Sequence, residues 1–173
     1  MKLSYFYEIL FLTTLILLQV LFLNRIHLFG YATPILYSYF LLKLPMERNV
    51  FFVLISAFLM GLSIDIFLNT PGMNAAAITI VAAFQRNIRN LFFERSDYYD
   101  EFVPGIHTAP KAFLRFTALV VSLHIALLFF IESFTLFNLI NTVLRIVSSF
   151  VISFTLIIAI DSLMYREKKI SEP

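Results

Sequence analysis

AFLMGLSIDIFLNTPGMNAAA, residues 57–77, is the stretch in which this apolar chain gathers its small and polar side chains. On a helix, one slowly turning face would carry the residues spaced four apart, which are Ala57, Gly61, Asp65 and Asn69. The following Thr70-Pro71-Gly72 interrupts the helix, and Thr70 and Pro71 suit the N-cap and first position of a new one. The stretch therefore predicts an apolar helix, a tight turn and a returning helix.

The composition decides whether water or membrane lipid surrounds this helix pair. Of 173 residues, 60% are hydrophobic and only 14% are charged, whereas about one quarter of an ordinary soluble domain is charged. The apolar residues come in long blocks, which is typical of membrane helices. We therefore expect an all-α membrane protein with a single domain over residues 1–173. The absence of cysteine excludes disulfides, thiolate metal sites and a cysteine nucleophile.

The apolar blocks predict a compact bundle of six transmembrane helices. Their approximate bounds are 6–23, 27–42, 50–68, 71–85, 112–131 and 138–160. The second block is expected to be a kinked, protein-buried helix because it contains Pro34, and His27 lies in the outer turn before it. The fourth block is short and is expected to continue as an interfacial helix to about residue 93. Residues 86–111 then form the one sizeable loop, which is predicted to be cytoplasmic.

The placement of the basic residues predicts the orientation. Six spans put both termini on one side of the membrane, and only Arg25 and Arg145 of the 13 Lys and Arg residues then fall on the other side. The positive-inside rule reads this asymmetry as N and C termini in the cytoplasm. Four basic residues flank the loop and are expected to meet anionic lipids or an acidic partner, not nucleic acid: Arg86, Arg89, Arg95 and Lys111.

Asp65 is an ionisable residue inside a predicted span, and such a residue is a functional-site hypothesis by default. We predict that it lies close to Arg145 of the sixth span, as an ion pair or in a cluster with Asn69, Asn74 or Asn141. The alternative is that Asp65 caps amides of the local turn while Arg145 extends outward. Helical spacing also predicts an inward polar face on the sixth span, formed by Asn138, Asn141, Arg145 and Ser148, with Thr142 and Ser149 alongside.

No combination of residues predicts catalysis. The chain has only four glycines, no Ser beside a His base and no His-Glu-x-x-His motif. The three histidines, His27, His107 and His124, are predicted to lie at different depths, whereas a metal needs convergent ligands. Asp97, Asp100 and Glu101 are expected to be a solvated acidic loop. We therefore expect a protein that is not an enzyme and has no cofactor or metal site.

Residues 61–77, GLSIDIFLNTPGMNAAA, resemble a Gly-x-x-x-Asp, Thr-Pro-Gly and small-residue pattern of the MreD family. Residues 24–42, NRIHLFGYATPILYSYFLL, are similar to a segment of one branch of that family. The resemblance implies a six-helix fold related to the S components of energy-coupling-factor transporters. It also implies a non-enzymatic scaffold of the bacterial rod-shape system that binds MreC, in a complex with MreB, RodA and its transpeptidase.

Two functions follow from these observations. A scaffold would dock the single span of an MreC-like partner on the small-residue face of the third span or the polar face of the sixth. A vitamin-binding S component would instead need a cavity that opens outward near Asp65, Asn69, Asn74 and Arg145. S components usually meet their transporter through a small-residue motif early in the chain. The first span here contains no Ala or Gly, which counts against the second function.

Overall fold

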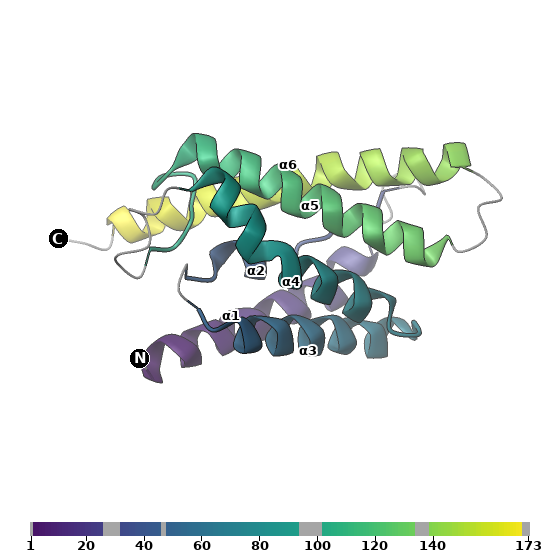
Figure 1. The fold of residues 1–173 in the computed structure, drawn as a ribbon, viewed down its shortest axis with the longest axis horizontal. Helices are drawn as coiled ribbons and strands as arrows, with labels where there is room; N and C mark the ends of the chain where they lie inside the picture. Colours follow the sequence, from purple (N-terminus) through teal and green to yellow (C-terminus); the bar gives the residue numbers. More distant parts are fainter. Residues whose placement is uncertain (1, 26–31, 46–47, 94–101, 134–138, 171–173) are drawn as a thin grey trace.

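The chain folds into a bundle of helices in the computed structural model, which describes residues 2–25, 32–45, 48–93, 102–133 and 139–170 (Figure 1). The elements in chain order are α1 Lys2–Leu21, the 3-10 helix η1 Leu23–Arg25, α2 Tyr39–Lys43, α3 Val50–Leu68, α4 Met73–Phe92, α5 Pro110–Glu132 and α6 Leu139–Ile170. His27 and Asn138, which the sequence singled out, lie outside the described residues.

Four helical segments in the described part of the chain are long and apolar enough to cross a membrane. They are Tyr5–Arg25, Val50–Leu68, Pro110–Glu132 and Ile140–Met164. Their outer surfaces expose large hydrophobic side chains, such as Phe51, Ile66 and Ile140. A surface of this kind is stable in hydrocarbon and not in water. The protein is therefore an all-α bundle that spans a membrane.

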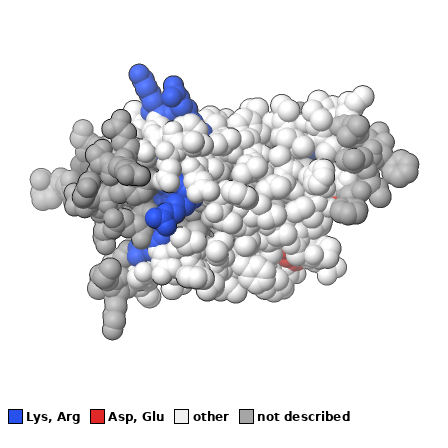
Figure 2. Space-filling view, in the orientation of Figure 1, with Lys and Arg blue, Asp and Glu red and all other residues white. Residues whose placement is uncertain are grey.

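The helices run back and forth between two ends of the bundle. α3 packs on α4, α4 on α5 and α5 on α6, while α1 lies beside α3 (Figure 1). α1 begins at the same end at which α6 finishes, and Figure 2 shows Lys and Arg side chains gathered there beside an uncharged middle. We call this the basic end; its described cations are Lys43, Arg48, Arg86, Arg89, Lys111 and Arg115. The opposite end, where α1 and α5 finish, contains a pocket that is described below, and we call it the pocket end.

The helix expected over residues 27–42 is wrong in the part that the structure describes, residues 32–42. Residues 33–36 are not helical, and only Tyr39–Lys43 forms a short helix, α2. Pro34 has no N–H, and the backbone on either side of it is bound by α6 instead of by its own helix. The N–H groups of Thr33 and Ile35 donate to the hydroxyls of Ser149 and Ser153, at 3.1 and 2.8 Å.

Gln19 of α1 holds the same segment from the other side. The Leu36 N–H donates to Gln19 Oε1 at 2.8 Å, and Gln19 Nε2 donates to the Pro34 carbonyl at 2.9 Å. Gln19 is 1% exposed, and Ile35 and Leu36 are buried as well. Irregular backbone is tolerated at membrane depth only where protein groups satisfy it, and here two side chains of α6 and one of α1 do so. We call residues 32–38 the buried strap.

The inward face of α6 differs from the predicted one. Its buried residues follow one another at four-residue steps, as Ser149, Ser153, Ile157 and Asp161. Asn141 is exposed, and Ser148 is half-buried and donates back to the Leu144 carbonyl of its own helix. Of the polar residues that face inward, Ser149 and Ser153 bind the strap, whereas Asp161 binds Tyr39 and Lys43.

α3 and α4 approach each other most closely at Gly61. A Cβ atom on Gly61 would lie 2.5 Å from Ala75 Cα, a distance that no real side chain tolerates. Ala57, one turn earlier on the same face, is 0% exposed. The small-residue face of α3 is therefore covered by the chain itself, and the expectation that it is a free docking surface is wrong.

Candidate functional site

Asp65 organises the turn between α3 and α4. Its carboxylate is 2% exposed and accepts hydrogen bonds from the Asn74 N–H at 3.1 Å, Asn74 Nδ2 at 2.9 Å and the Ala75 N–H at 2.8 Å. The Thr70 hydroxyl also donates to it. The N–H groups in the first turn of a helix have no partner within the helix, and the helix dipole favours a negative charge there. Asp65 therefore caps α4 from the preceding helix.

The residues of the turn explain why α4 begins where it does. Asn69 ends α3 in the left-handed region with φ 54°, and Gly72 precedes α4 with φ 79°. The predicted N-cap at Thr70, with Pro71 as first helical residue, is wrong, because α4 begins two positions later at Met73. Gly72 has no side chain with which to cap, and Asp65 supplies that function across the turn.

The predicted pairing of Asp65 with Arg145 is also wrong. Arg145 binds Glu132 at 2.9 Å, and its guanidinium lies 4.7 Å from the centre of the Phe129 ring. Both charged side chains are about one third exposed. Asp65 instead has the donors of the local turn, which is the alternative that the sequence left open.

A chain of hydrogen bonds extends from Asp65 into the bundle. The Tyr37 hydroxyl of the buried strap donates to Asn74 Oδ1 at 2.8 Å and lies 3.0 Å from His124 Nε2 of α5. Because the one hydroxyl proton goes to Asn74, His124 donates its Nε2–H to Tyr37. The order of donation is thus His124, Tyr37, Asn74 and Asp65. It links α5, the strap, α4 and α3 into one rigid unit.

Sequence reasoning missed the two inner members of this chain. His124 was considered only as a possible metal ligand, and Tyr37 was not considered as its partner. Their side chains are 0% and 1% exposed. The available signal was His124 itself, since an ionisable residue within a span needs a polar partner on a neighbouring element.

A pocket of about 200 Å³ opens at the pocket end of the bundle. Its polar lining comes from Gln19, Asn24, Thr33, Tyr37, Thr70, Asn74, Glu132 and Arg145. Its apolar lining comes from Ile35, Leu68, Met73, Leu128 and Phe129. The pocket thus touches α1, η1, the strap, α3, α4, α5 and α6. It includes two of the residues around which the sequence predicted an outward cavity, Asn74 and Arg145.

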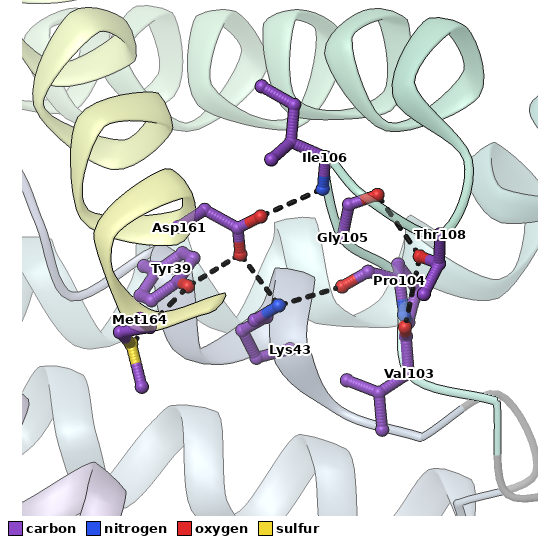
Figure 3. Close-up of polar contacts among 9 residues, drawn as sticks. All are labelled: Tyr39, Lys43, Val103, Pro104, Gly105, Ile106, Thr108, Asp161 and Met164. Atoms are coloured by element: carbon purple, nitrogen blue, oxygen red, sulfur yellow. Dashed lines mark hydrogen bonds and ion pairs between the residues drawn. The ribbon is translucent and has the colours of Figure 1, made fainter. Parts of the chain in front are cut away.

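A second polar cluster lies at the basic end (Figure 3). Asp161 of α6 is 3% exposed and binds Lys43 Nζ at 2.6 Å, the Tyr39 hydroxyl at 2.7 Å and the Ile106 N–H at 2.8 Å. Lys43 also donates to the Pro104 carbonyl at 3.1 Å. This cluster ties α2 and α6 to the segment before α5. Asp161 directly follows the sixth expected span, 138–160, and no role was predicted for it.

The cations of the basic end differ in exposure, and some are buried and bind other parts of the chain. Arg86 is exposed, as a lipid-facing or partner-facing residue should be. Arg89, for which the same role was expected, is 4% exposed and donates to the Pro45 carbonyl at 3.1 Å. Its main role is therefore internal. Arg95 lies outside the described residues.

The two polar clusters consist of residues that hold helices together, whereas the pocket of about 200 Å³ has polar groups and room for another molecule. A larger pocket of about 300 Å³, lined by residues of α1, α2 and α3, is mostly apolar. No protein-family model, no curated protein and no solved structure matches this chain.

Proposed function

We propose that this protein is a non-enzymatic scaffold of the bacterial rod-shape system that binds an MreC-like partner and supports cell-wall elongation. The proposal rests on the resemblance of residues 61–77, and one structural observation supports it. Four residues of that stretch build the α3–α4 contact and turn: Gly61 for close packing, Asp65 as the cap, and Asn69 and Gly72 for the left-handed positions. Such a motif specifies a rigid shape, which is what a scaffold presents to its partners.

We further propose that the basic end faces the cytoplasm of the bacterial inner membrane. The described cations concentrate at that end, and Arg25 and Arg145 are the two at the pocket end. This is the asymmetry that the positive-inside rule describes. Both termini would then be cytoplasmic, where partners such as MreB act, while the pocket end would face the outer side, where RodA and its transpeptidase build the wall.

Single cysteine variants test this orientation, because the natural chain has no cysteine. A membrane-impermeant maleimide added to intact spheroplasts should label Asn141→Cys at the pocket end and leave Lys111→Cys unlabelled. Both sites are exposed, so access and not burial decides the result. After lysis both variants should react. Labelling of Lys111→Cys in intact spheroplasts would reverse the proposed orientation.

The surface that meets an MreC-like span should be a helix face that the chain itself does not cover. Because α4 covers the small-residue face of α3, the partner's helix would pack on α6 instead. Here Ile140, Leu144, Val147 and Val151 are exposed at spacings of four, three and four residues. This is the spacing of a stripe that packs against a second helix. Disulfide or photo-crosslinks to the partner should therefore form from Val147, and not from Ala57 on the covered face.

Affinity purification from membranes solubilised in a mild detergent tests the function directly. A tagged copy of this protein should recover an MreC-like protein that has one membrane span. A matched preparation of an unrelated tagged membrane protein at equal expression controls for non-specific capture. Recovery of a transmembrane coupling subunit with its ATPases, and no MreC-like protein, would overturn the proposal.

The second candidate function is small-molecule binding, as in an S component of an energy-coupling-factor transporter. The observation in its favour is the pocket at the pocket end, which includes Asn74 and Arg145. The absence of Ala and Gly from residues 6–23 counts against it, as the expected contact motif is missing. Copurified ATPases and uptake of a vitamin that depends on this protein would favour this second function.

A further inference from the structure

Among the described residues, the pocket at the pocket end is lined by one positive and one negative side chain. Arg145 and Glu132 line it together and lie 2.9 Å apart, so the pocket as a whole is electrically neutral. A ligand with a single charge would meet an opposite charge and a like charge at nearly the same place. A ligand that carries both charges could bind each of them favourably.

The pocket also offers hydrogen-bond donors that the protein does not use. The Arg145 guanidinium has one hydrogen-bonded partner in the described part of the chain, Glu132, although it carries five donor hydrogens. Asn24 accepts a hydrogen bond from Gln19 through Oδ1 at 2.7 Å, while its Nδ2 is buried without a partner. A buried donor without an acceptor is costly. Asn24 and Arg145 line the same pocket, and their unused donors suit an anion with several oxygen atoms.

The volume and depth of the pocket restrict the ligand further. Its volume of about 200 Å³ is below the roughly 300–1,000 Å³ of sites for drug-sized ligands, so a small polar group fits better than a whole vitamin. Glu132 is the last residue of one apolar spanning segment, and Arg145 lies near the start of another. The charged part of the pocket is therefore at the level where a bilayer has its headgroups.

We propose that this pocket binds a zwitterionic phosphoethanolamine group, with the phosphate at Arg145 and Asn24 and the ammonium at Glu132. Phosphatidylethanolamine of the surrounding bilayer supplies this group at the right depth, and soluble phosphoethanolamine carries the same chemistry. The apolar residues Leu128 and Met73 would contact the carbon atoms that join or flank the two charges. The inference does not depend on a role in cell shape.

Native mass spectrometry of the delipidated, purified protein tests the proposal with three additives: phosphatidylethanolamine, phosphatidylglycerol and soluble phosphoethanolamine. Phosphatidylglycerol has the phosphate and lacks the ammonium. We expect phosphatidylethanolamine to bind about fivefold more tightly than phosphatidylglycerol, the size of one partly exposed charge contact. Equal binding of the two lipids to the natural protein would overturn the proposal. Comparable binding of soluble phosphoethanolamine would support the site and indicate that its ligand comes from solution and not from the bilayer.

Variants separate this pocket from non-specific lipid binding. Glu132→Gln should abolish the preference for phosphatidylethanolamine, whereas Arg145→Gln should weaken the binding of both lipids. Asn24→Asp keeps the acceptor for Gln19 but puts a negative charge beside the phosphate, so it should also weaken both. Arg25→Gln is the matched control, because Arg25 is an exposed cation at the same end that does not line the pocket. An unchanged preference in Glu132→Gln, or an equal loss in Arg25→Gln, would contradict the assignment.

Discussion

Replacing Asp65 with alanine removes the cap of α4, and the structure sets the size of the effect. Four donors lose their acceptor. The Thr70 hydroxyl is half-buried and can turn toward water, whereas the N–H of Asn74, the N–H of Ala75 and the Asn74 amide remain buried. At about 1 kcal/mol for each buried donor left unpaired, the free energy of unfolding should fall by about 3 kcal/mol.

Thermal unfolding in mild detergent, followed by circular dichroism at a helix wavelength, measures this loss. For a chain of this size about 2–4 °C accompany each kcal/mol, so the midpoint should fall by roughly 6–12 °C. The midpoint should fall by less in Asp65→Asn, which retains one acceptor oxygen. It should fall least in Thr70→Ala, which removes only the water-accessible donor. A fall below about 2 °C in Asp65→Ala, less than one unpaired donor costs, would refute the capping role.

Three further changes test other parts of the fold by the same assay. Gly61→Ala places a Cβ against Ala75 Cα, so we expect a loss of about 1–3 kcal/mol as α3 and α4 separate; an unchanged midpoint would contradict the close contact. Lys43→Met leaves the buried Asp161 without its cation, which should cost about 2–3 kcal/mol and raise hydrogen exchange in residues 103–108, with partial recovery when Asp161→Asn is added. Asn69→Gly should change stability by no more than about 0.5 kcal/mol, because φ 54° suits glycine; a larger loss would show that the Asn69 side chain has a role of its own.

The long helices could be predicted because membrane helices need nothing beyond an apolar run of sufficient length. α3 is an example, since residues 50–68 are apolar apart from small residues and Asp65. The same reasoning failed for residues 32–38, which are apolar enough for a helix. What decides their conformation is the set of side chains on α1 and α6 that bind their backbone, and the contacts with α6 join residues more than 100 positions apart.

The site was predicted in part for a similar reason. The sequence identified Asp65 and the turn residues correctly as the polar centre of α3 and α4. It could not choose between a distant cation and local amides as partners of Asp65, because both are compatible with helical spacing. The structure favours the amides, since four donors of one turn satisfy a buried carboxylate without the cost of burying a second charge.

The inward face of α6 shows how a pattern can mislead. Asn141, Arg145 and Ser148 share one face of the helix, but polar residues near the start of a span can also lie at the membrane surface. The buried positions are Ser149 and Ser153, whose small hydroxyls are less conspicuous in the sequence and bind the strap. Only the position of the strap distinguishes the two faces.

Depletion of this protein in the cells that encode it tests the proposed scaffold role most directly. The measurement is the length-to-width ratio of the cells, with a plasmid copy of the natural protein as the control for rescue. The account predicts that cells become wider and rounder as the protein is lost and that the ratio returns with the plasmid copy. An unchanged ratio, together with a growth defect that an excess of one vitamin cures, would contradict the scaffold role and favour a transporter component.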